Sequence, residues 1–341
     1  MGPLYCLAAS GGGDMVQTNR KLLLLTSGGD APGMNSAIRS VVRTACYHGM
    51  RVFACHDGYH GLVEQAIFPM APSDVSGCIQ LGGTILRSGR SKSFRQLEVR
   101  QRVAAFLKDE GIGYLVAIGG DGTFRGAALL EQLGDIKTIG IPGTIDNDIV
   151  GTEYTIGFDT ARNNAVRALD KIRDTSASSG LNFLVEIMGR RAGFLALDVG
   201  ISAGAEYILV PEYPIEVSKL AEGIMHPARP KRSVIIVVSE ADCPGRSFGI
   251  ADELRGMTPG HEYRVCVLGH VQRGGMPTAQ DRVVASIMGN MAVEGLLAGK
   301  SNCMVAFQNG SYLFAPLPDP DLPARSLSSQ ELLKLNEVLA I

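Results

Sequence analysis

The sequence lacks the features that would tie it to a nucleic acid, a membrane or an oxidising compartment. Its 32 Lys and Arg residues are balanced by 34 Asp and Glu residues, so no broad basic field attracts polyanions. No apolar stretch approaches the roughly 18 residues that a membrane span requires. The seven cysteines are dispersed without a C-x-x-C pair, which argues against a disulfide framework and a structural zinc site. We expect no nucleic-acid partner, no membrane partner, and cysteines that are mostly small core residues.

The N-terminal segment "MGPLYCLAASGGGDMVQTNR" lacks the basic start and the long apolar centre of a signal peptide. We expect residues 1–19 to form a flexible extension and the protein to be soluble and cytoplasmic. The chain of 341 residues, 45% of them hydrophobic, is long enough for two ordinary domains or one large one.

Short apolar runs alternate with amphipathic segments, which predicts an α/β fold with largely parallel sheets. Two helices are indicated by apolar stripes at helical spacing, at Met34, Ala37, Ile38, Val41, Val42 and Ala45, and at Ala165, Ala168, Leu169 and Ile172. A boundary near residue 157, without a polar linker, predicts two closely packed lobes with a cleft between them. The expected strands are 21–26, 51–55, 114–118, 137–141, 183–187, 206–210, 233–238, 265–269 and 303–307.

Two segments share one layout, an apolar strand followed by Gly-Gly-Asp and a helix: "LLLLTSGGDAPGMNSAIRS" (22–40) and "YLVAIGGDGTFRGAALL" (114–130). Either loop alone is equally well explained as a tight turn, but two of them favour a phosphate ligand facing both. Neither is a Walker A or a G-x-G-x-x-G motif. We reject "GLLAGKS" (295–301) as a P-loop, because its glycine spacing is one residue short and it follows a helical segment.

Asp121 lies inside the second of these loops, where a bare carboxylate would repel phosphate. Mg²⁺ accompanies polyphosphates and takes oxygen ligands, so Asp121 is a candidate magnesium ligand. The alternative is an aspartate that caps the following helix, and both roles are compatible.

Carboxylates and cations follow several of the later strands. In "PGTIDNDIVGTEYTIGFDT" (142–160), Asp146 and Asp148 could act as a general base and a second metal ligand, although an Asx-rich turn is slightly favoured by composition alone. "EIMGRRAGFLAL" (186–197) and "VLGHVQRGGMPTAQDR" (267–282) place Arg190, His270 and Arg273 at strand ends. Together these groups suggest phosphoryl transfer onto a small molecule that is already phosphorylated.

In order and spacing, the motifs "LTSGGDAPGMNSAIRSVVR", "GGDGT", "PGTIDNDIVGT", "EIMGRRAG" and "LGHVQRGG" resemble the 6-phosphofructokinase family over residues 21 to about 310. NAD kinases and lipid kinases carry loops like "GGDGT", but not the full set. The resemblance implies transfer of the γ-phosphoryl group of ATP to the 1-hydroxyl of fructose 6-phosphate in glycolysis. It also implies a nucleotide-binding lobe of residues 20–157 plus 271–321 and a sugar-phosphate lobe of residues 158–270 plus 322–341.

The resemblance also implies residue roles. Asp146 looks like the base, Thr144, Arg190 and Arg90 like groups that hold the phosphoryl group, and Asp121 like the Mg²⁺ ligand. The implied ATP site comprises Gly29, Tyr59, Arg90, Ser91, Gly120, Asp121, Gly122 and Thr123, with Gly29 also catalytic. The implied sugar-phosphate site comprises Thr144, Ile145, Asp146, Met188, Gly189, Arg190, Glu240, Arg264, His270, Val271, Gln272 and Arg273. Arg264 looks like an arginine lent across a subunit interface, which implies a homo-oligomer, expected to be a tetramer.

Two positions bear on the phosphoryl donor. Pyrophosphate-using relatives carry an Asp after "GGD" and a Lys in place of the Gly of "PGT". This chain has Gly122 and Gly143 there, so ATP is favoured over pyrophosphate.

Two departures from the family pattern leave questions open. Leu181 stands where bacterial allosteric members carry an arginine for fructose 6-phosphate, a loss of roughly 1.5–3 kcal/mol in sugar binding. A regulatory-nucleotide site is suggested by Arg39, Arg43, Arg173, Glu206 and Lys231, but Pro72 replaces a further expected arginine, and a solvated helix face competes with this interpretation. The alternatives are a pyrophosphate-dependent or other sugar-phosphate kinase, and a non-catalytic regulatory subunit.

Overall fold

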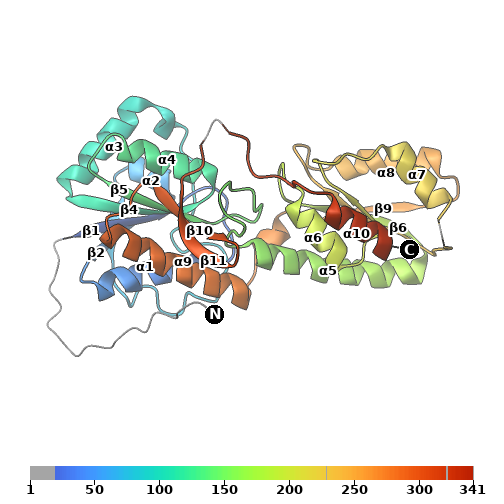
Figure 1. The fold of residues 1–341 in the computed structure, drawn as a ribbon, viewed down its shortest axis with the longest axis horizontal. Helices are drawn as coiled ribbons and strands as arrows, with labels where there is room; N and C mark the ends of the chain where they lie inside the picture. The colour runs from blue at the N-terminus through green and yellow to red at the C-terminus, as the bar shows by residue number, and fades with distance from the viewer. Residues whose placement is uncertain (1–19, 228, 320–321, 341) are drawn as a thin grey trace.

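The computed structural model describes residues 20–227, 229–319 and 322–340. The extension expected at residues 1–19 lies outside the described residues. Two α/β halves lie side by side along the long axis of the molecule, each with its own sheet (Figure 1). The predicted fold class, two lobes with mainly parallel sheets flanked by helices, is confirmed.

The first half is built on a seven-stranded sheet in the order β11-β10-β5-β4-β1-β2-β3. Its inner strands pair in parallel, whereas β3 and β11 pair antiparallel at the two edges. The strands are β1 (Lys21–Thr26), β2 (Arg51–Cys55), β3 (Ile67–Met70), β4 (Ile112–Gly119), β5 (Lys137–Pro142), β10 (Cys303–Gln308) and β11 (Ser311–Pro316).

Helices cover both faces of this sheet because its central strands are apolar on both sides. Along β1, Leu22 and Leu24 face the core shared with α1 (Met34–Tyr47) and α9 (Ala279–Leu297). Leu23 and Leu25 face the opposite core, formed with α2 (Tyr59–Val63), α3 (Leu97–Asp109) and α4 (Asp121–Glu131). This alternation is the two-residue period of a strand.

The second half contains a four-stranded parallel sheet in the order β7-β8-β6-β9. Its strands are β6 (Asn182–Ile187), β7 (Tyr207–Leu209), β8 (Ile235–Ser239) and β9 (Tyr263–Val267). Helices α5 (Phe158–Ser179) and α6 (Phe194–Ser202) cover one face, and α7 (Val217–Met225) and α8 (Arg246–Met257) cover the other. Helix α10 (Glu331–Leu339) packs against α6 and β7.

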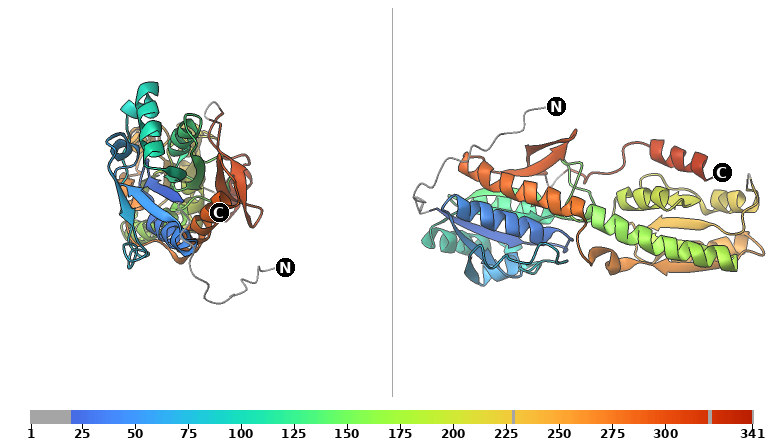
Figure 2. Two further views of the ribbon diagram at one scale, coloured as in Figure 1. Left: turned by 90° about the vertical axis from the view of Figure 1, so that its left-hand side faces the viewer. Right: turned by 90° about the horizontal axis from the view of Figure 1, so that it is seen from below.

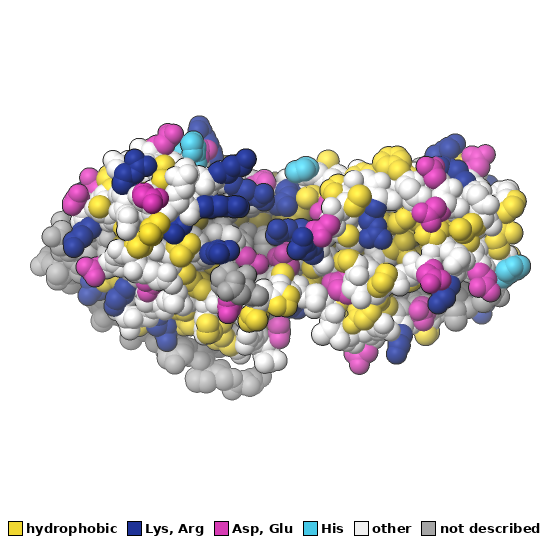
Figure 3. Space-filling view, turned by 90° about the horizontal axis from the view of Figure 1, so that it is seen from above, with side chains coloured by type: hydrophobic (Ala, Val, Ile, Leu, Met, Phe, Trp, Pro, Cys, Tyr) yellow, Lys and Arg dark blue, Asp and Glu magenta, His cyan; other side chains and the backbone are white. Residues whose placement is uncertain are grey.

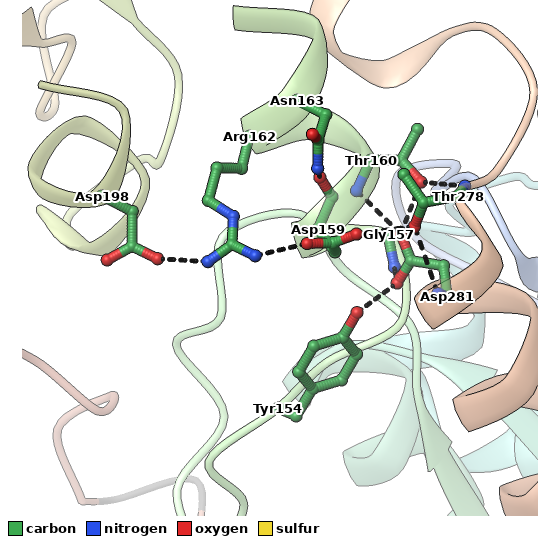
Figure 4. Close-up of polar contacts among 9 residues, drawn as sticks. All are labelled: Tyr154, Gly157, Asp159, Thr160, Arg162, Asn163, Asp198, Thr278 and Asp281. Atoms are coloured by element: carbon green, nitrogen blue, oxygen red, sulfur yellow. Dashed lines mark hydrogen bonds and ion pairs between the residues drawn. The ribbon is translucent and has the colours of Figure 1, made fainter. Parts of the chain in front are cut away.

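A buried carboxylate joins the two halves. Helices α5 and α9 meet where the halves join (Figure 2). There Asp281, fully buried in the first turn of α9, accepts hydrogen bonds from the Tyr154 hydroxyl, from the Gly157 backbone N–H, and from both the N–H and the hydroxyl of Thr160 (Figure 4). Asp281 therefore fixes the start of α5 and the end of the preceding loop to the first half.

The structure has a strand at each of the nine expected positions, with two further strands and small shifts in the bounds. β3 and β11 were not predicted, and β9 begins two residues before the expected strand 265–269. Of the six cysteines that the structure describes, Cys55 and Cys78 are buried in the cores, and Cys46 and Cys303 are partly buried against one of them, in agreement with the expectation that most are core residues. Among the described residues, no helix combines the length and the hydropathy that crossing a membrane requires.

Candidate active site

A cavity of about 820 Å³ lies at the carboxyl ends of strands from both sheets. The segments that follow β1, β4, β5, β6 and β8 all contribute to its lining. On the face shown in Figure 3, Lys and Arg side chains gather on both sides of the middle of the molecule, with acidic side chains between them. Parallel sheets place ligands at this edge, so the cavity is the candidate active site.

The two glycine-rich loops face this cavity together. β1 and β4 pair directly in parallel, with Thr26 opposite Ile118, so their loops emerge side by side. Gly28, Gly29, Gly120 and Gly122 all line the cavity. The two loops therefore face one cavity, as expected, and its use as a ligand site stays a prediction.

An aromatic wall closes the cavity near the second loop. The Tyr59 hydroxyl donates to the Thr123 carbonyl at 2.6 Å, and the Tyr59 ring stacks on Phe94 with a centroid separation of 4.4 Å. A Cβ at position 126 would lie 2.5 Å from the Tyr59 ring, so a glycine is needed there. Burial raises the pKa of the Tyr59 hydroxyl, so it remains a hydrogen-bond donor at neutral pH.

Asp121 is the first residue of α4 and faces the cavity. The N-cap of α4 is Gly120, and no side chain caps this helix, so the interpretation of Asp121 as a helix cap is wrong. Its Oδ1 is buried without a hydrogen-bond partner. Burial raises the pKa of Asp121, and the Arg190 charge opposes that rise.

The loop after β5 places two more carboxylates in the cavity. Asp146 is only 8% exposed and its Oδ1 has no hydrogen-bond partner, while its backbone N–H donates to Thr144 Oγ1 at 3.2 Å. Burial raises the pKa of Asp146, and Arg273 and Arg190 oppose that rise. Burial, together with the charges of Asp146 and Asp121, raises the pKa of Asp148 to about 7.

Glu240 holds the backbone of Arg190. Arg190 has a left-handed φ of 54°, a conformation that non-glycine residues adopt only when the surroundings impose it. The Arg190 N–H donates to Glu240 Oε1 at 3.1 Å, which fixes this turn. Burial raises the pKa of Glu240, and the N–H groups of Arg190 and Gly189 oppose that rise.

Arg273 connects the last motif to the first loop. Its Nη1 donates to the Asp30 carbonyl at 3.0 Å. A Cβ at position 29 would lie 2.6 Å from the same guanidinium atom, so only glycine lets Arg273 lie against this loop without displacement. The "GGD" and "LGHVQRGG" motifs, far apart in the sequence, are therefore adjacent.

The cavity gathers many of the residues expected from the sequence. Those that line it are Gly29, Tyr59, Arg90, Ser91, Gly120, Asp121, Gly122, Thr123, Thr144, Asp146, Arg190, Glu240 and Arg273. The other expected sugar-phosphate residues do not line it. Ile145, Met188 and Gln272 are buried, Gly189 forms the turn before Arg190, and Arg264, His270 and Val271 lie outside the cavity.

Phe94, Arg95, Arg100 and Arg125 also line the cavity and were not expected. Arg125 lies two residues after "GGDGT" in the first turns of α4, so helical proximity to Asp121 was a usable signal. Arg100 donates to the carbonyls of Phe94 and Arg95 and so shapes their turn. No sequence motif marks that turn.

The candidate effector residues fall into two groups in one chain. Glu206 lies 3.8 Å from Arg173 and 3.7 Å from Lys231, as a cluster in the second half. Arg39 and Arg43 lie on α1 in the first half. One chain does not bring the two groups together.

Comparison with known proteins fits this geometry. The sequence model of the family described as phosphofructokinase matches residues 21–296. The ATP-dependent 6-phosphofructokinase of Coxiella burnetii is 50% identical over 320 residues, covering 94% of this chain and 98% of that protein. An ATP-dependent 6-phosphofructokinase 1 of Thermus thermophilus is 48% identical over 94% of this chain and is matched over its whole length.

Two solved structures share the fold. Pichia pastoris phosphofructokinase in the T-state has a TM-score of 0.82 and 34% identity over 88% of this chain, which spans only 35% of that longer chain. The pyrophosphate-dependent phosphofructokinase from Marinobacter aquaeolei has a TM-score of 0.77 and 26% identity, over 90% of this chain and 85% of that one. The match to the family model over most of the chain and the identity to full-length relatives establish that this chain belongs to the phosphofructokinase family.

Proposed function

We infer that the chain is an ATP-dependent 6-phosphofructokinase, which transfers the γ-phosphoryl group of ATP to the 1-hydroxyl of fructose 6-phosphate in glycolysis. Its relatives of nearly equal length carry that name. The observation that carries the assignment to the cavity is Asp146, a buried carboxylate with one unpartnered oxygen among arginines.

Asp146 is the proposed general base. Its burial moves the pKa upward, toward the range in which a carboxylate accepts a proton efficiently near neutral pH. The 1-hydroxyl proton passes to Asp146 as the sugar oxygen forms a bond to the γ-phosphorus. The bond between that phosphorus and the β–γ bridging oxygen breaks, and ADP leaves with the electron pair.

The cations around Asp146 stabilise the negative charge of the transferring group. The Arg273 guanidinium is held by the Asp30 carbonyl, so its charge is in place before substrate arrives, and the Arg190 backbone is held by Glu240. Arg90 lines the same cavity and is proposed to reach the phosphoryl group, with the Thr144 hydroxyl and the Gly29 backbone beside it. The residues that complete the proposed nucleotide site are Tyr59, Ser91, Gly120, Gly122 and Thr123.

The donor set fits Mg²⁺. Asp121 has a buried oxygen without a hydrogen-bond partner, and burial, with the charges of Asp146 and Asp121, raises the pKa of Asp148, so a bound cation would stabilise both carboxylates. In the part of the chain that the structure describes, no His, Cys, Asp and Glu side chains form a complete metal cage, so phosphate and water would supply further ligands. We propose Asp121 as the protein ligand; when bound, Mg²⁺ neutralises phosphate charge.

The glycines of the nucleotide site support ATP as donor. A Cβ at Gly122 would meet no atom within 4 Å, so a side chain at this cavity position would occupy space left for the nucleotide. At Gly143 an added Cβ would lie 3.1 Å from Met34 and 3.2 Å from Ile118, so a larger side chain would be directed into the cavity or displace the core.

We propose that the protein is a homotetramer in the cytoplasm. Its sugar-phosphate site is proposed to be shared between two subunits. Glu240 and Arg273 belong to the site of one chain, with Ile145, Met188, Gly189 and Gln272 as its supporting residues. Arg264 lies outside that cavity and is proposed to act on a neighbouring site, whereas His270 and Val271 directly precede Gln272 and Arg273 and stay with the proposed site of their own chain. Leu181 precedes β6 at the end opposite the cavity, so an arginine there would likewise serve a neighbour, and its absence predicts weaker sugar binding.

We also propose a regulatory site, formed where Arg173, Glu206 and Lys231 of one chain meet Arg39 and Arg43 of another. The first group already surrounds one carboxylate, so a phosphate ligand would have to compete with Glu206 for Arg173 and Lys231.

The test measures fructose 1,6-bisphosphate formation with Mg-ATP and with Mg-pyrophosphate across sugar concentrations. We expect rapid turnover with ATP alone. Asp146→Asn should lower kcat by a few orders of magnitude with substrate binding largely intact. Asp242→Asn, at an exposed ion pair with Arg191, is the matched control and should leave kcat unchanged. Product from pyrophosphate, or near-normal turnover by Asp146→Asn, would contradict the proposal.

A further inference from the structure

The end of the chain runs from the first half to the second across the junction between them (Figure 1). We call residues 322–340 the C-terminal strap. It lies beyond residues 21–296, the part of the chain that the family model matches. Its far end is fastened by Asn336, which donates to the Ala205 carbonyl at 3.1 Å, and by Lys231, which donates to the Ala340 carbonyl.

Near its start, the strap contacts the loop that carries Asp146. The Arg325 backbone N–H donates to the Asp148 carbonyl at 2.8 Å, and Arg325 Nη1 donates to the Asn147 carbonyl at 3.0 Å. One residue therefore binds two consecutive peptide groups, directly after the proposed base.

The same side chain contacts the segment that carries Arg190. The Arg325 guanidinium lies 4.3 Å from the centroid of the Phe194 ring, within the range of a cation–π contact. Phe194 is the first residue of α6, four positions after Arg190 and continuous with its turn. Arg325 thus bridges two loops from different sheets, one with the base and one with the cation of the proposed reaction.

The loop needs such a restraint. Asn147 has a left-handed φ of 52°, a conformation that asparagine tolerates better than most residues, so the local backbone leaves the path of the loop to surrounding contacts. The charges of Asp146 and Asp121 both act unfavourably on the Asp148 carboxylate, so this loop holds like charges close together. Within the loop, Asn147 donates to the Glu153 carbonyl at 3.1 Å. The contacts to the two carbonyls that follow Asp146 come from Arg325.

We propose that Arg325 is a positioning residue for phosphoryl transfer: by bonding the Asn147 and Asp148 carbonyls while stacking on Phe194, it keeps Asp146 and Arg190 in one fixed relation. It does not line the cavity and acts through those two residues. This inference rests on the proposed roles of Asp146 and Arg190. Displacements of about 1 Å at reacting groups can lower turnover about a hundredfold, so a restraint of this kind is kinetically important.

The test compares Arg325→Met and Arg325→Lys in the full-length protein. Both variants keep the backbone hydrogen bond from residue 325 to the Asp148 carbonyl and change only the side chain. Methionine keeps an unbranched apolar side chain near Phe194 that cannot donate to the Asn147 carbonyl, whereas lysine keeps the charge and an N–H donor group without the planar fork. We expect Arg325→Met to lower kcat about ten- to a hundredfold, with KM for both substrates within about twofold. Arg325→Lys should fall between it and the wild type.

The control is Asn336→Ala, which loosens the far end of the strap without touching the loop. It should leave kcat unchanged even if it lowers the melting temperature. Amide hydrogen exchange supplies a readout independent of turnover: Arg325→Met should accelerate exchange in residues 144–157, and Asn336→Ala should not.

Each outcome separates the hypotheses. Normal kcat in Arg325→Met, or a rise in KM without loss of kcat, overturns the positioning role. Equal losses of kcat in Asn336→Ala and Arg325→Met also overturn it, because they would reflect docking of the whole strap. Failure of the proposed function itself is visible separately, as an inactive wild type or an active Asp146→Asn.

Discussion

At the scale of single residues, the cavity brings together groups whose charges repel one another. Asp121, Asp146 and Asp148 are all drawn toward the neutral form by burial, and they interact unfavourably when ionised. Arg190 opposes this rise in pKa at each of them. Such a site destabilises the ligand-free fold so that charged substrates can be bound, a conflict found at many functional sites.

The unfavourable burial of Asp148 predicts a measurable pH dependence of stability. Its folded-state pKa of about 7 lies above the ordinary value of 3.8, so between these values the folded protein holds a proton that the unfolded chain has released. The free energy of unfolding therefore falls as pH rises through this window. Asp148→Asn removes the effect, so without nucleotide and magnesium the variant should be roughly 2–4 kcal/mol more stable than wild type at pH 8, and no more stable near pH 4.

Urea unfolding of both proteins across pH 4 to 8 is the measurement. If the free energy of unfolding of Asp148→Asn exceeded that of the wild type by the same amount at pH 4 and at pH 8, the difference would come from packing rather than from ionisation. Catalytic activity of the same variant should fall, since the stabilising change removes a charge from the cavity.

At the scale of elements, the junction of α5 and α9 depends on Asp281. Replacing it with alanine would leave buried donors of Tyr154, Gly157 and Thr160 without an acceptor. We expect Asp281→Ala to lower the free energy of unfolding by about 3–5 kcal/mol, as measured by urea denaturation.

Asp198→Ala is the matched control. Asp198 accepts a hydrogen bond from Arg162 at 2.9 Å, close to the Asp281 contacts, but the side chains of both residues in this pair are partly exposed to solvent (Figure 4). It should cost less than about 1 kcal/mol. If both variants lost the same stability, the junction would not be the dominant restraint that its burial indicates.

The sequence predicted the central elements well, because both faces of the strands in each half are buried and their apolar runs are continuous. β1 and β2 have the bounds expected for them. Edge elements were missed for identifiable reasons. β3 is four residues long and contains Pro69, whereas β11 follows a two-residue turn, Asn309–Gly310, in which both residues have positive φ. An Asn-Gly pair between two alternating segments is a hairpin signal, so β11 was recoverable.

The site was predictable where one loop carries the chemistry, and unpredictable where distant segments meet. Asp121 and Asp146 follow buried strands, so their place at the sheet edge followed from periodicity and family motifs. Arg325 has no motif, and its contacts with Asn147 and Phe194 depend on the path of the strap through space. No local pattern encodes that path.

At the scale of the whole molecule, a single chain holds only part of the sugar-phosphate site that the family pattern implies. Arg264 lies on β9, an edge strand of the four-stranded sheet, where it is exposed and 3.4 Å from Glu262. Arg264 does not line the cavity of its own chain. An edge strand with an exposed arginine is a surface from which a charge can be offered to another subunit.

If Arg264 serves a neighbouring site, Arg264→Ala should raise the KM for fructose 6-phosphate about tenfold or more, with kcat less affected, because a charge-assisted phosphate contact is lost. Mixed oligomers then decide where the residue acts. Subunits of Arg264→Ala keep Asp146, and subunits of Asp146→Asn keep Arg264. A hybrid assembled from both would contain some sites with an intact base and an intact arginine from opposite chains. Activity at low sugar concentration should therefore exceed the sum of the two parent variants after they are unfolded and refolded together. Simple additivity would mean that Arg264 acts within its own chain or not at all, and the shared site would have to be abandoned.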